Sequence, residues 1–168
     1  ESFLARQPVS FLPDLPPQEV QKVICTLTKE QAALYQATVD EAMRKIREAE
    51  GIERRGQVLA LLTALKQVCN HPAHYLGEDG PLAGRSGKLA RLGEMLEEVV
   101  ESGERALVFT QYREMGNRLG KYLEEIGIGS LFLHGGLGRT ARDNMVKEFQ
   151  EGPDAPPVFL LSLKAGGT

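Results

Sequence analysis

The residues best suited to chemistry stand late in the sequence, where an apolar run meets small and polar side chains. Residues 158–161 (VFLL) have no polar alternation, which predicts a strand buried on both faces. Ser162, Lys164, Gly166 and Gly167 follow. A hydroxyl, a cation and glycines at the carboxyl end of a parallel strand suit phosphate binding, because glycine lets backbone N–H groups approach an anion closely. We therefore expect a phosphate-binding loop, and we expect the chain to be part of a longer protein.

Two earlier segments end in the same way, which predicts further polar groups at the same edge of a sheet. Residues 105–109 and 131–133 are short apolar runs that predict strands. The residues that follow them include Thr110, Gln111, His134, Gly135 and Gly136. Ligands bind outside the carboxyl ends of parallel strands. We expect these strand ends and residues 162–168 to form one polar rim, in which His134 makes a strand-end hydrogen bond.

Helices predicted around these strands would hold the rim in place. One helix is expected to begin after Ser86 and to end at Gly103, and residues 113–126 and 140–149 carry apolar side chains at helical spacing. Alternating short strands and helices predict βαβ units and a parallel sheet. The predicted fold class is therefore α/β, and we assign residues 81–168 to this lobe.

The first part of the chain differs in composition and predicts a connector. Residues 1–18 are rich in proline and lack periodicity, and residues 20–27 alternate well enough for one strand. Thr28, with Gln31 three residues later, has the spacing of a capping box at the start of a helix. We expect this helix to end at Gly51.

A second helix is expected over residues 56–68, and Pro72 cannot continue it. Its apolar stripe, expected to be buried, consists of Val58, Leu61, Leu62, Leu65 and Val68. Residues 28–71 therefore predict a helical hairpin. We assign residues 1–80 to a connector that contains a strand and this hairpin.

Composition and charge limit the possible functions. The 168 residues include 20 basic and 23 acidic side chains and carry a net charge of −3, so the basic excess typical of nucleic-acid binders is absent. Cys25 and Cys69 form no CxxC pair, which favours reduced thiols inside a cell. The longest mostly apolar stretch, residues 58–65, is shorter than the ~20 residues of a membrane helix. The first residues do not resemble a signal peptide. We expect a cytoplasmic protein with no membrane partner.

Five segments, taken together and in order, resemble one known family. They are residues 65–72 (LKQVCNHP), 86–89 (SGKL), 105–112 (RALVFTQY), 133–143 (LHGGLGRTARD) and 158–168 (VFLLSLKAGGT). They resemble the second RecA-like lobe of the Swi/Snf-type ATP-dependent DNA translocases of helicase superfamily two, and the run into that lobe. The likeness is closest to bacterial members, and it covers about residues 18–168.

The resemblance implies a two-lobed motor and an incomplete RecA-like sheet in this chain. In such a motor ATP and Mg²⁺ bind between the lobes, on the first lobe's Walker loop, and the second lobe grips the DNA backbone. The implied partners are double-stranded DNA, the first RecA-like lobe and other protein subunits. Residues 1–80 would then be an inter-lobe connector. Because the first lobe is missing, we expect the isolated chain to hydrolyse no ATP and to hold no cofactor, and we expect the longer protein to be nucleoid-associated.

The resemblance assigns DNA-backbone contacts to Thr110, Gln111, Gly135, Gly136, Arg142, Ser162 and Lys164. It places Gly166 and Gly167 beside the nucleotide, and it assigns no catalytic residue and no metal ligand to this chain. Gly136 and Leu137 stand where the family often has Ser or Thr, so a side-chain contact with phosphate is not expected there. Arg142 fits a phosphate contact and a structural ion pair equally well.

Weaker signals favour structural roles, and two rival functions remain. Residues 84–88 (GRSGK) lack the spacing of a Walker loop, so a helix cap at Ser86 is expected. Cys69, His71 and His74 lack a fourth metal ligand. The rival functions are a helicase-shaped lobe used only for docking, and a free-standing nucleotide-binding enzyme. The absence of a phosphate loop or an acid/base pair counts against the enzyme. A Walker loop upstream and an arginine-rich motif downstream would distinguish the motor from the docking module.

Overall fold

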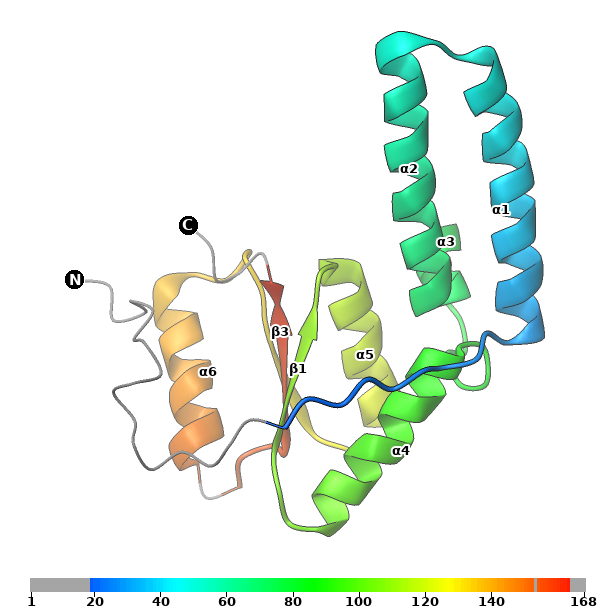
Figure 1. The fold of residues 1–168 in the computed structure, drawn as a ribbon. Coiled ribbons are helices and arrows are strands. Elements are labelled where there is room, and N and C mark those ends of the chain that lie inside the picture. The colour runs from blue at the N-terminus through cyan, green and yellow to red at the C-terminus, as the bar shows by residue number, and fades with distance from the viewer. Residues whose placement is uncertain (1–18, 153, 164–168) are drawn as a thin grey trace.

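The computed structural model describes residues 19–152 and 154–163 of the 168-residue chain. Within these ranges the elements are α1 (Lys29–Glu48), α2 (Gly51–Asn70), α3 (Pro72–Leu76), α4 (Gly87–Glu101), β1 (Ala106–Thr110), α5 (Arg113–Glu125), β2 (Ser130–Leu133), α6 (Arg139–Glu151) and β3 (Val158–Ser162). Figure 1 shows two parts. A long hairpin of α1 and α2 projects from an α/β unit that contains the three strands.

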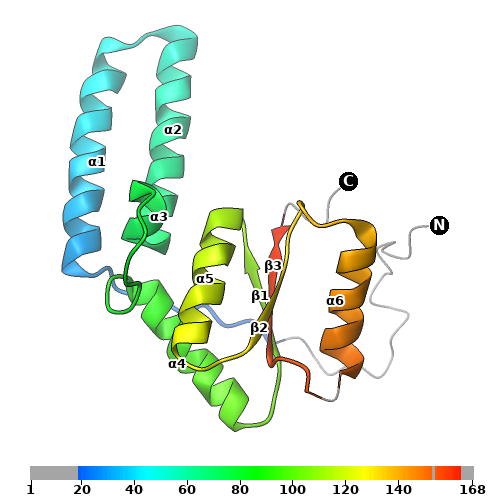
Figure 2. The same cartoon turned by 180° about the vertical axis from the view of Figure 1, so that it is seen from behind.

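The three strands form a parallel sheet in the order β1-β3-β2. The last strand of the described residues is therefore the central one, which explains why its first four residues are apolar: Val158 and Leu160 are fully buried and Phe159 is 4% exposed. Helices α4 and α5 lie on one side of the sheet and α6 lies on the other (Figures 1 and 2). The α/β prediction is confirmed.

The hydrophobic core lies between the sheet and helices α4 and α5. Leu89 and Leu96 of α4, Leu123 of α5 and Leu160 of β3 are among its buried members. The opposite side of the sheet is covered more thinly, since α6 has no buried residue. Phe149 of α6 packs there on Phe159, with ring centroids 5.0 Å apart. On β1 this side is open, and Leu107 and Phe109 are 56% and 58% exposed.

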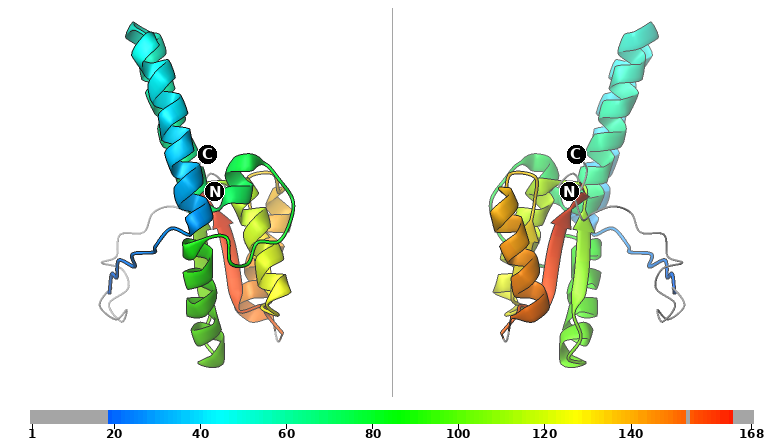
Figure 3. Two further views of the ribbon diagram at one scale, coloured as in Figure 1. Left: turned by 90° about the vertical axis from the view of Figure 1, so that its right-hand side faces the viewer. Right: turned by 90° about the vertical axis from the view of Figure 1, so that its left-hand side faces the viewer.

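Helix α1 begins as the sequence predicts. The Thr28 hydroxyl accepts a hydrogen bond from Gln31 N, and the Gln31 side chain accepts one from Thr28 N, which completes the capping box. On the outer face of the helix Lys45 donates to Glu41 at 2.7 Å. The hairpin rises past the carboxyl ends of the strands, and in Figure 3 it is seen edge-on as one narrow rod.

The strand predicted over residues 20–27 is not formed. Residues 19–28 have no regular secondary structure, and Val20 and Ile24 are 75% and 96% exposed. The alternating pattern needs a neighbouring strand to supply hydrogen bonds, and none lies beside this segment in the described part of the chain. Instead, the backbone of Thr26 lies against Gly87 at the start of α4.

Helix α2 differs from its prediction in extent and in burial. It begins at Gly51, whose φ of +55° makes the turn from α1, and Gly56 is tolerated inside it. The stripe predicted to be buried is mostly open: only Val68 is fully buried, whereas Leu62 is 52% exposed. The reason is the position of the hairpin, which stands away from the sheet so that α2 has α1 on one side and no second layer on the other (Figure 1). No helix in the described ranges is both long enough and apolar enough to cross a membrane.

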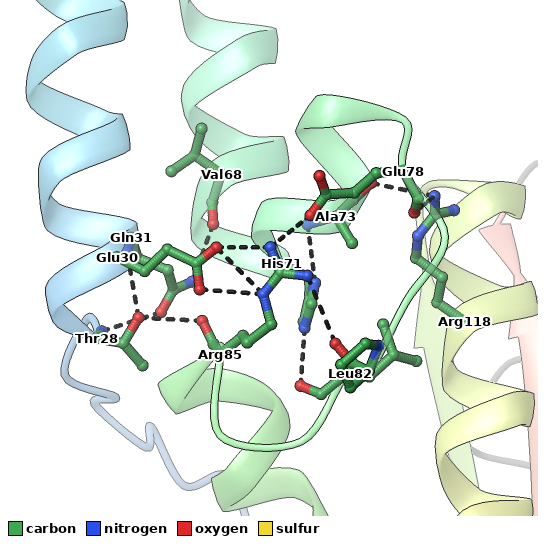
Figure 4. A network of polar contacts seen from close by, with 11 residues as sticks. Thr28, Glu30, Gln31, Val68, His71, Ala73, Glu78, Leu82, Arg85 and Arg118 are labelled. Atoms are coloured by element: carbon green, nitrogen blue, oxygen red, sulfur yellow. Dashed lines mark hydrogen bonds and ion pairs between the residues drawn. The ribbon is translucent and has the colours of Figure 1, made fainter.

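A buried polar junction ties the hairpin to the α/β unit (Figure 4). Pro72 has no N–H, so the carbonyl of Val68 lacks its usual helical donor. The fully buried Gln31 supplies one, with Nε2 at 2.9 Å from Val68 O. Its Oε1 accepts from Gly87 N at 3.2 Å. One side chain therefore connects α1, the end of α2 and the start of α4.

Ionic and imidazole contacts complete this junction. Arg85 donates to the carboxylates of Glu30 and Glu78, and these hydrogen bonds raise its pKa. The fully buried His71 accepts from Ala73 N through Nδ1, and its Nε2 lies 3.0 Å from the carbonyl of Leu82. The base of the hairpin is thus held beside the edge of the sheet where the strands end.

Candidate functional site

The carboxyl ends of the three strands border a cleft of about 360 Å³, which we call the rim cleft. Four sequence-predicted residues line it: Gln111, Gly135, Gly136 and Ser162. Gln111 follows β1, the two glycines follow β2, and Ser162 ends β3. The parallel sheet brings these residues together as expected, and their contact with DNA stays a prediction.

Thr110 has a different position from the other predicted residues. It is 9% exposed, and its hydroxyl accepts a hydrogen bond from Tyr112 N at 3.3 Å. This side chain therefore shapes the turn from β1 into α5. The turn leaves the neighbouring Gln111 exposed at the mouth of the rim cleft.

The loop after β2 is stabilised by His134. Its Nδ1 accepts a hydrogen bond from Gly136 N at 3.1 Å, which confirms the predicted strand-end role. A Cβ at position 136 would lie 3.2 Å from the His134 ring and 3.1 Å from Nη1 of Arg113. Such contacts are tighter than most Cβ atoms make, so glycine leaves the necessary room at this point of the rim.

Arg142 of α6 donates hydrogen bonds to the backbone of the same loop. Its Nε donates to Leu137 O at 2.9 Å, and its Nη2 donates to Gly135 O at 3.2 Å. These hydrogen bonds favour a positioning role for the guanidinium. A direct phosphate contact by Arg142 stays a prediction.

Cationic side chains stand beside this loop. Arg113, the first residue of α5, is exposed and lines the rim cleft. Partial burial lowers the pKa of His134, and the nearby guanidinium groups of Arg113 and Arg142 lower it further. Glu114 is the one acidic group among the lining residues. An anion in the cleft would meet the Arg113 guanidinium, two amides, a hydroxyl and glycine backbone, and it would be opposed by the Glu114 carboxylate.

Five lining residues were not predicted from the sequence: Gln67 of α2, His74 of α3, Tyr112 after β1, and Arg113 and Glu114 of α5. Gln67 and His74 come from the hairpin side of the junction, and no local pattern links them to a strand end. Burial lowers the pKa of His74, and its Nδ1 has no hydrogen-bond partner among the described residues. Arg113 had a usable signal, because it is a cation two residues after Gln111 at the start of a predicted helix.

Three predicted residues, Lys164, Gly166 and Gly167, lie outside the described residues. Nothing in the fold bears on their assignment to DNA or nucleotide.

The sequence that resembles a Walker loop forms a helix cap, as expected. The Ser86 hydroxyl accepts from Leu89 N at 3.2 Å and caps α4. A Cβ at Gly87 would lie 1.9 Å from the carbonyl oxygen of Thr26, and Lys88 donates to Asn70 Oδ1 at 3.0 Å. The Gly87 N–H also donates to Gln31 Oε1, so the hydroxyl and backbone donors that a triphosphate would need are taken, and this segment does not fit a nucleotide.

The cysteine–histidine sequence around the end of α2 is likewise structural. Both ring nitrogens of His71 are engaged by backbone groups. Across residues 19–152 and 154–163, no three His, Cys, Asp or Glu side chains gather as metal ligands.

Two family models match the chain. Residues 2–74 match the SNF2-related domain, and residues 87–168 match the helicase conserved C-terminal domain. Residues 75–86 lie between the two matches and contain the loop with Glu78 and Arg85. The hairpin thus falls in the first match and the sheet in the second. The division of the chain at residue 80 stays a prediction.

Proteins with similar sequence or structure include ATP-dependent helicases and SWI2/SNF2 ATPases. The chain is 40% identical over 158 residues to a putative ATP-dependent helicase/translocase, YwqA, of Bacillus subtilis, covering 92% of this chain and 17% of that protein. The Sulfolobus solfataricus SWI2/SNF2 ATPase C-terminal domain is 38% identical with a TM-score of 0.79, covering 86% of this chain and 63% of that one.

The ATPase core of the same archaeal protein in complex with dsDNA is 36% identical with a TM-score of 0.76, covering 82% of this chain and 29% of that one. The chain therefore spans only part of each relative. Its three-stranded parallel sheet with flanking helices matches the RecA-like C-terminal lobe of these ATPases. The chain belongs to the Swi/Snf family of ATP-dependent helicases and translocases.

Proposed function

We propose that this chain is part of an ATP-dependent DNA translocase, in which the rim cleft binds the backbone of duplex DNA. The observation that carries the proposal is the convergence of three strand ends on one cleft that offers a guanidinium, an amide, a hydroxyl and two glycines. The similarity to an ATPase core in complex with dsDNA supports the same ligand.

The chemistry of the rim suits phosphate rather than bases. The Arg113 guanidinium neutralises charge and the Gln111 amide and Ser162 hydroxyl can donate hydrogen bonds, but these contacts carry no sequence information. A translocase needs this property, because it must hold every step of its track equally well. We therefore propose that binding at the rim is independent of DNA sequence.

ATP and Mg²⁺ are implied by the family, and hydrolysis would supply the free energy for movement. Residues 84–88 do not form a triphosphate cradle, since the Ser86 hydroxyl and the Gly87 N–H are engaged within the protein. We therefore assign nucleotide binding to the missing first lobe, with Gly166 and Gly167 completing the inter-lobe site. We also propose a cytoplasmic, nucleoid-associated location for the longer protein.

The test compares phosphate release by the 168-residue chain and by the longer protein, each with and without duplex DNA. We expect DNA-stimulated turnover from the longer protein and none from the chain alone. Turnover by the pure chain would refute the assignment of nucleotide binding to a missing first lobe. A longer protein that neither binds duplex DNA nor responds to it would refute the translocase and favour a docking module.

A further inference from the structure

A second cleft opens beside the rim cleft, between the base of α2 and the carboxyl end of β1, with a volume of about 530 Å³. We call it the hairpin cleft. Lys66 and Cys69 line it from α2, Lys88 lines it from the first turn of α4, and Phe109 lines it from β1. The function proposed above uses none of these four side chains.

The charges of the hairpin cleft are one-sided. Two ammonium groups line it and no carboxylate does, although the chain has 23 acidic and 20 basic residues. In the described part of the chain neither Lys66 nor Lys88 forms an ion pair, whereas Lys45, Arg85, Arg91 and Arg118 each do. Two unpaired cations without a nearby acid leave a local positive potential that attracts an anion.

The ammonium group of Lys88 is held in position. It donates to Asn70 Oδ1 at 3.0 Å, and Asn70 is the last residue of α2. The Ser86 hydroxyl donates to the backbone carbonyl of the same asparagine at 2.7 Å. An ammonium has three N–H donors, so Lys88 keeps two for a ligand. The junction in Figure 4 connects α1, α2 and α4, so that Lys66 of α2 and Lys88 of α4 line the cleft from two elements that are fixed to one another.

The hairpin cleft adjoins the rim cleft. Gln111 and Tyr112, which lie in the turn after β1, line both clefts. A phosphodiester backbone that leaves the rim across this turn would next meet the hairpin cleft. Because the two clefts share lining residues, a polyanion that is already bound at the rim is favoured as the occupant over a separate acidic peptide.

We propose that Lys66 and Lys88 bind the phosphodiester backbone of the same duplex that occupies the rim. This proposal rests on the function proposed above and extends its site. Lys66 lies within the residues that match the SNF2-related domain, and Lys88 lies within the match to the helicase C-terminal domain. DNA in the hairpin cleft would therefore contact residues of both matched domains and link the two domains through its backbone.

The first experiment measures duplex affinity of the full-length protein against salt concentration. Lys66→Gln and Lys88→Gln remove the charges while keeping a polar side chain, and in Lys88→Gln a donor remains for Asn70. Each should reduce the slope of log K against log salt by about 0.9, and the double variant by about 1.8. Lys121→Ala is the matched control, because Lys121 is an exposed lysine of α5 that lines neither cleft. It should leave the slope unchanged, as should Lys66→Arg.

The second experiment uses the two native thiols. Cys69 lines the hairpin cleft and Cys25 does not, and both are half-buried and free. Saturating duplex DNA should slow alkylation of Cys69 at least several-fold, measured by peptide mass spectrometry, and leave Cys25 unchanged.

The outcomes separate this proposal from the one on which it rests. If both glutamine variants keep the wild-type slope while Arg113→Gln lowers it, the rim binds DNA and the hairpin cleft does not. If Arg113→Gln also keeps the wild-type slope, the proposed function itself fails. Protection of Cys69 by an acidic peptide such as poly-glutamate, but not by duplex DNA, would also overturn the proposal.

Discussion

Replacing Gln31 by leucine tests the physical account of the junction that holds the hairpin. The side chain makes four hydrogen bonds: Nε2 donates to Val68 O at 2.9 Å and Cys69 O at 3.3 Å, and Oε1 accepts from Thr28 N at 3.1 Å and Gly87 N at 3.2 Å. Leucine has a similar volume and can make none of them. No helical N–H can replace the donor to Val68, because the residue four positions later is proline.

The magnitude follows from these four interactions. A hydrogen bond contributes about 1 kcal/mol net, and a buried group left unpaired costs about 1–3 kcal/mol. Val68 is fully buried, so water cannot reach its carbonyl without a local rearrangement. Four lost hydrogen bonds, partly offset by apolar packing of leucine, give a loss of about 3 kcal/mol in the free energy of unfolding.

The assay is urea unfolding followed by circular dichroism, with Gln36→Leu as the matched control. Gln36 lies on the exposed face of the same helix, where it donates to Asp40 at 2.8 Å, and its replacement should change the free energy by less than about 0.5 kcal/mol. A Gln31→Leu protein that unfolds at the same urea concentration as the control would refute the junction as described.

Two further predictions concern the same region. Gly87→Ala should destabilise the protein by at least about 2 kcal/mol, because its Cβ would lie 1.9 Å from the backbone oxygen of Thr26, whereas Gly56→Ala, whose Cβ meets nothing within 4 Å, should stabilise α2 by about 0.5–1 kcal/mol; equal effects in thermal melts would contradict this. Burial lowers the pKa of His71 and of His74 below 6.5, so below that pH the unfolded chain binds more protons than the folded one. The urea midpoint should therefore fall as the pH drops from 6.5 to 5.5, less steeply in His74→Leu, and a midpoint that is flat or rises would show that these histidines do not titrate as described.

The sequence predicts those features that depend on neighbours along the chain. The capping box at Thr28, the cap at Ser86 and the apolar run of β3 each depend on residues within a few positions, and all are found. The parallel direction of the strands also follows, since short unalternating strands separated by helices leave few alternatives to a parallel sheet. The gathering of Gln111, Gly135 and Ser162 is a consequence of that sheet.

The features missed are those set by distant partners. Alternation over residues 20–27 predicts a strand only if a second strand lies alongside, and Thr26 meets Gly87 instead. The stripe on α2 predicts burial only if another layer covers it. His74 reaches the rim because of how the hairpin is tied to α4, which no local pattern records.

Peptide-resolved hydrogen exchange is the decisive test of whether the rim cleft binds the DNA backbone. Deuterium uptake of the full-length protein would be measured with and without saturating duplex DNA of two unrelated sequences. We expect slower exchange over residues 111–113 and 134–137 with either duplex, and no change over residues 51–56 at the tip of the hairpin. Unchanged exchange at both rim segments, or protection by only one of the two sequences, would contradict it.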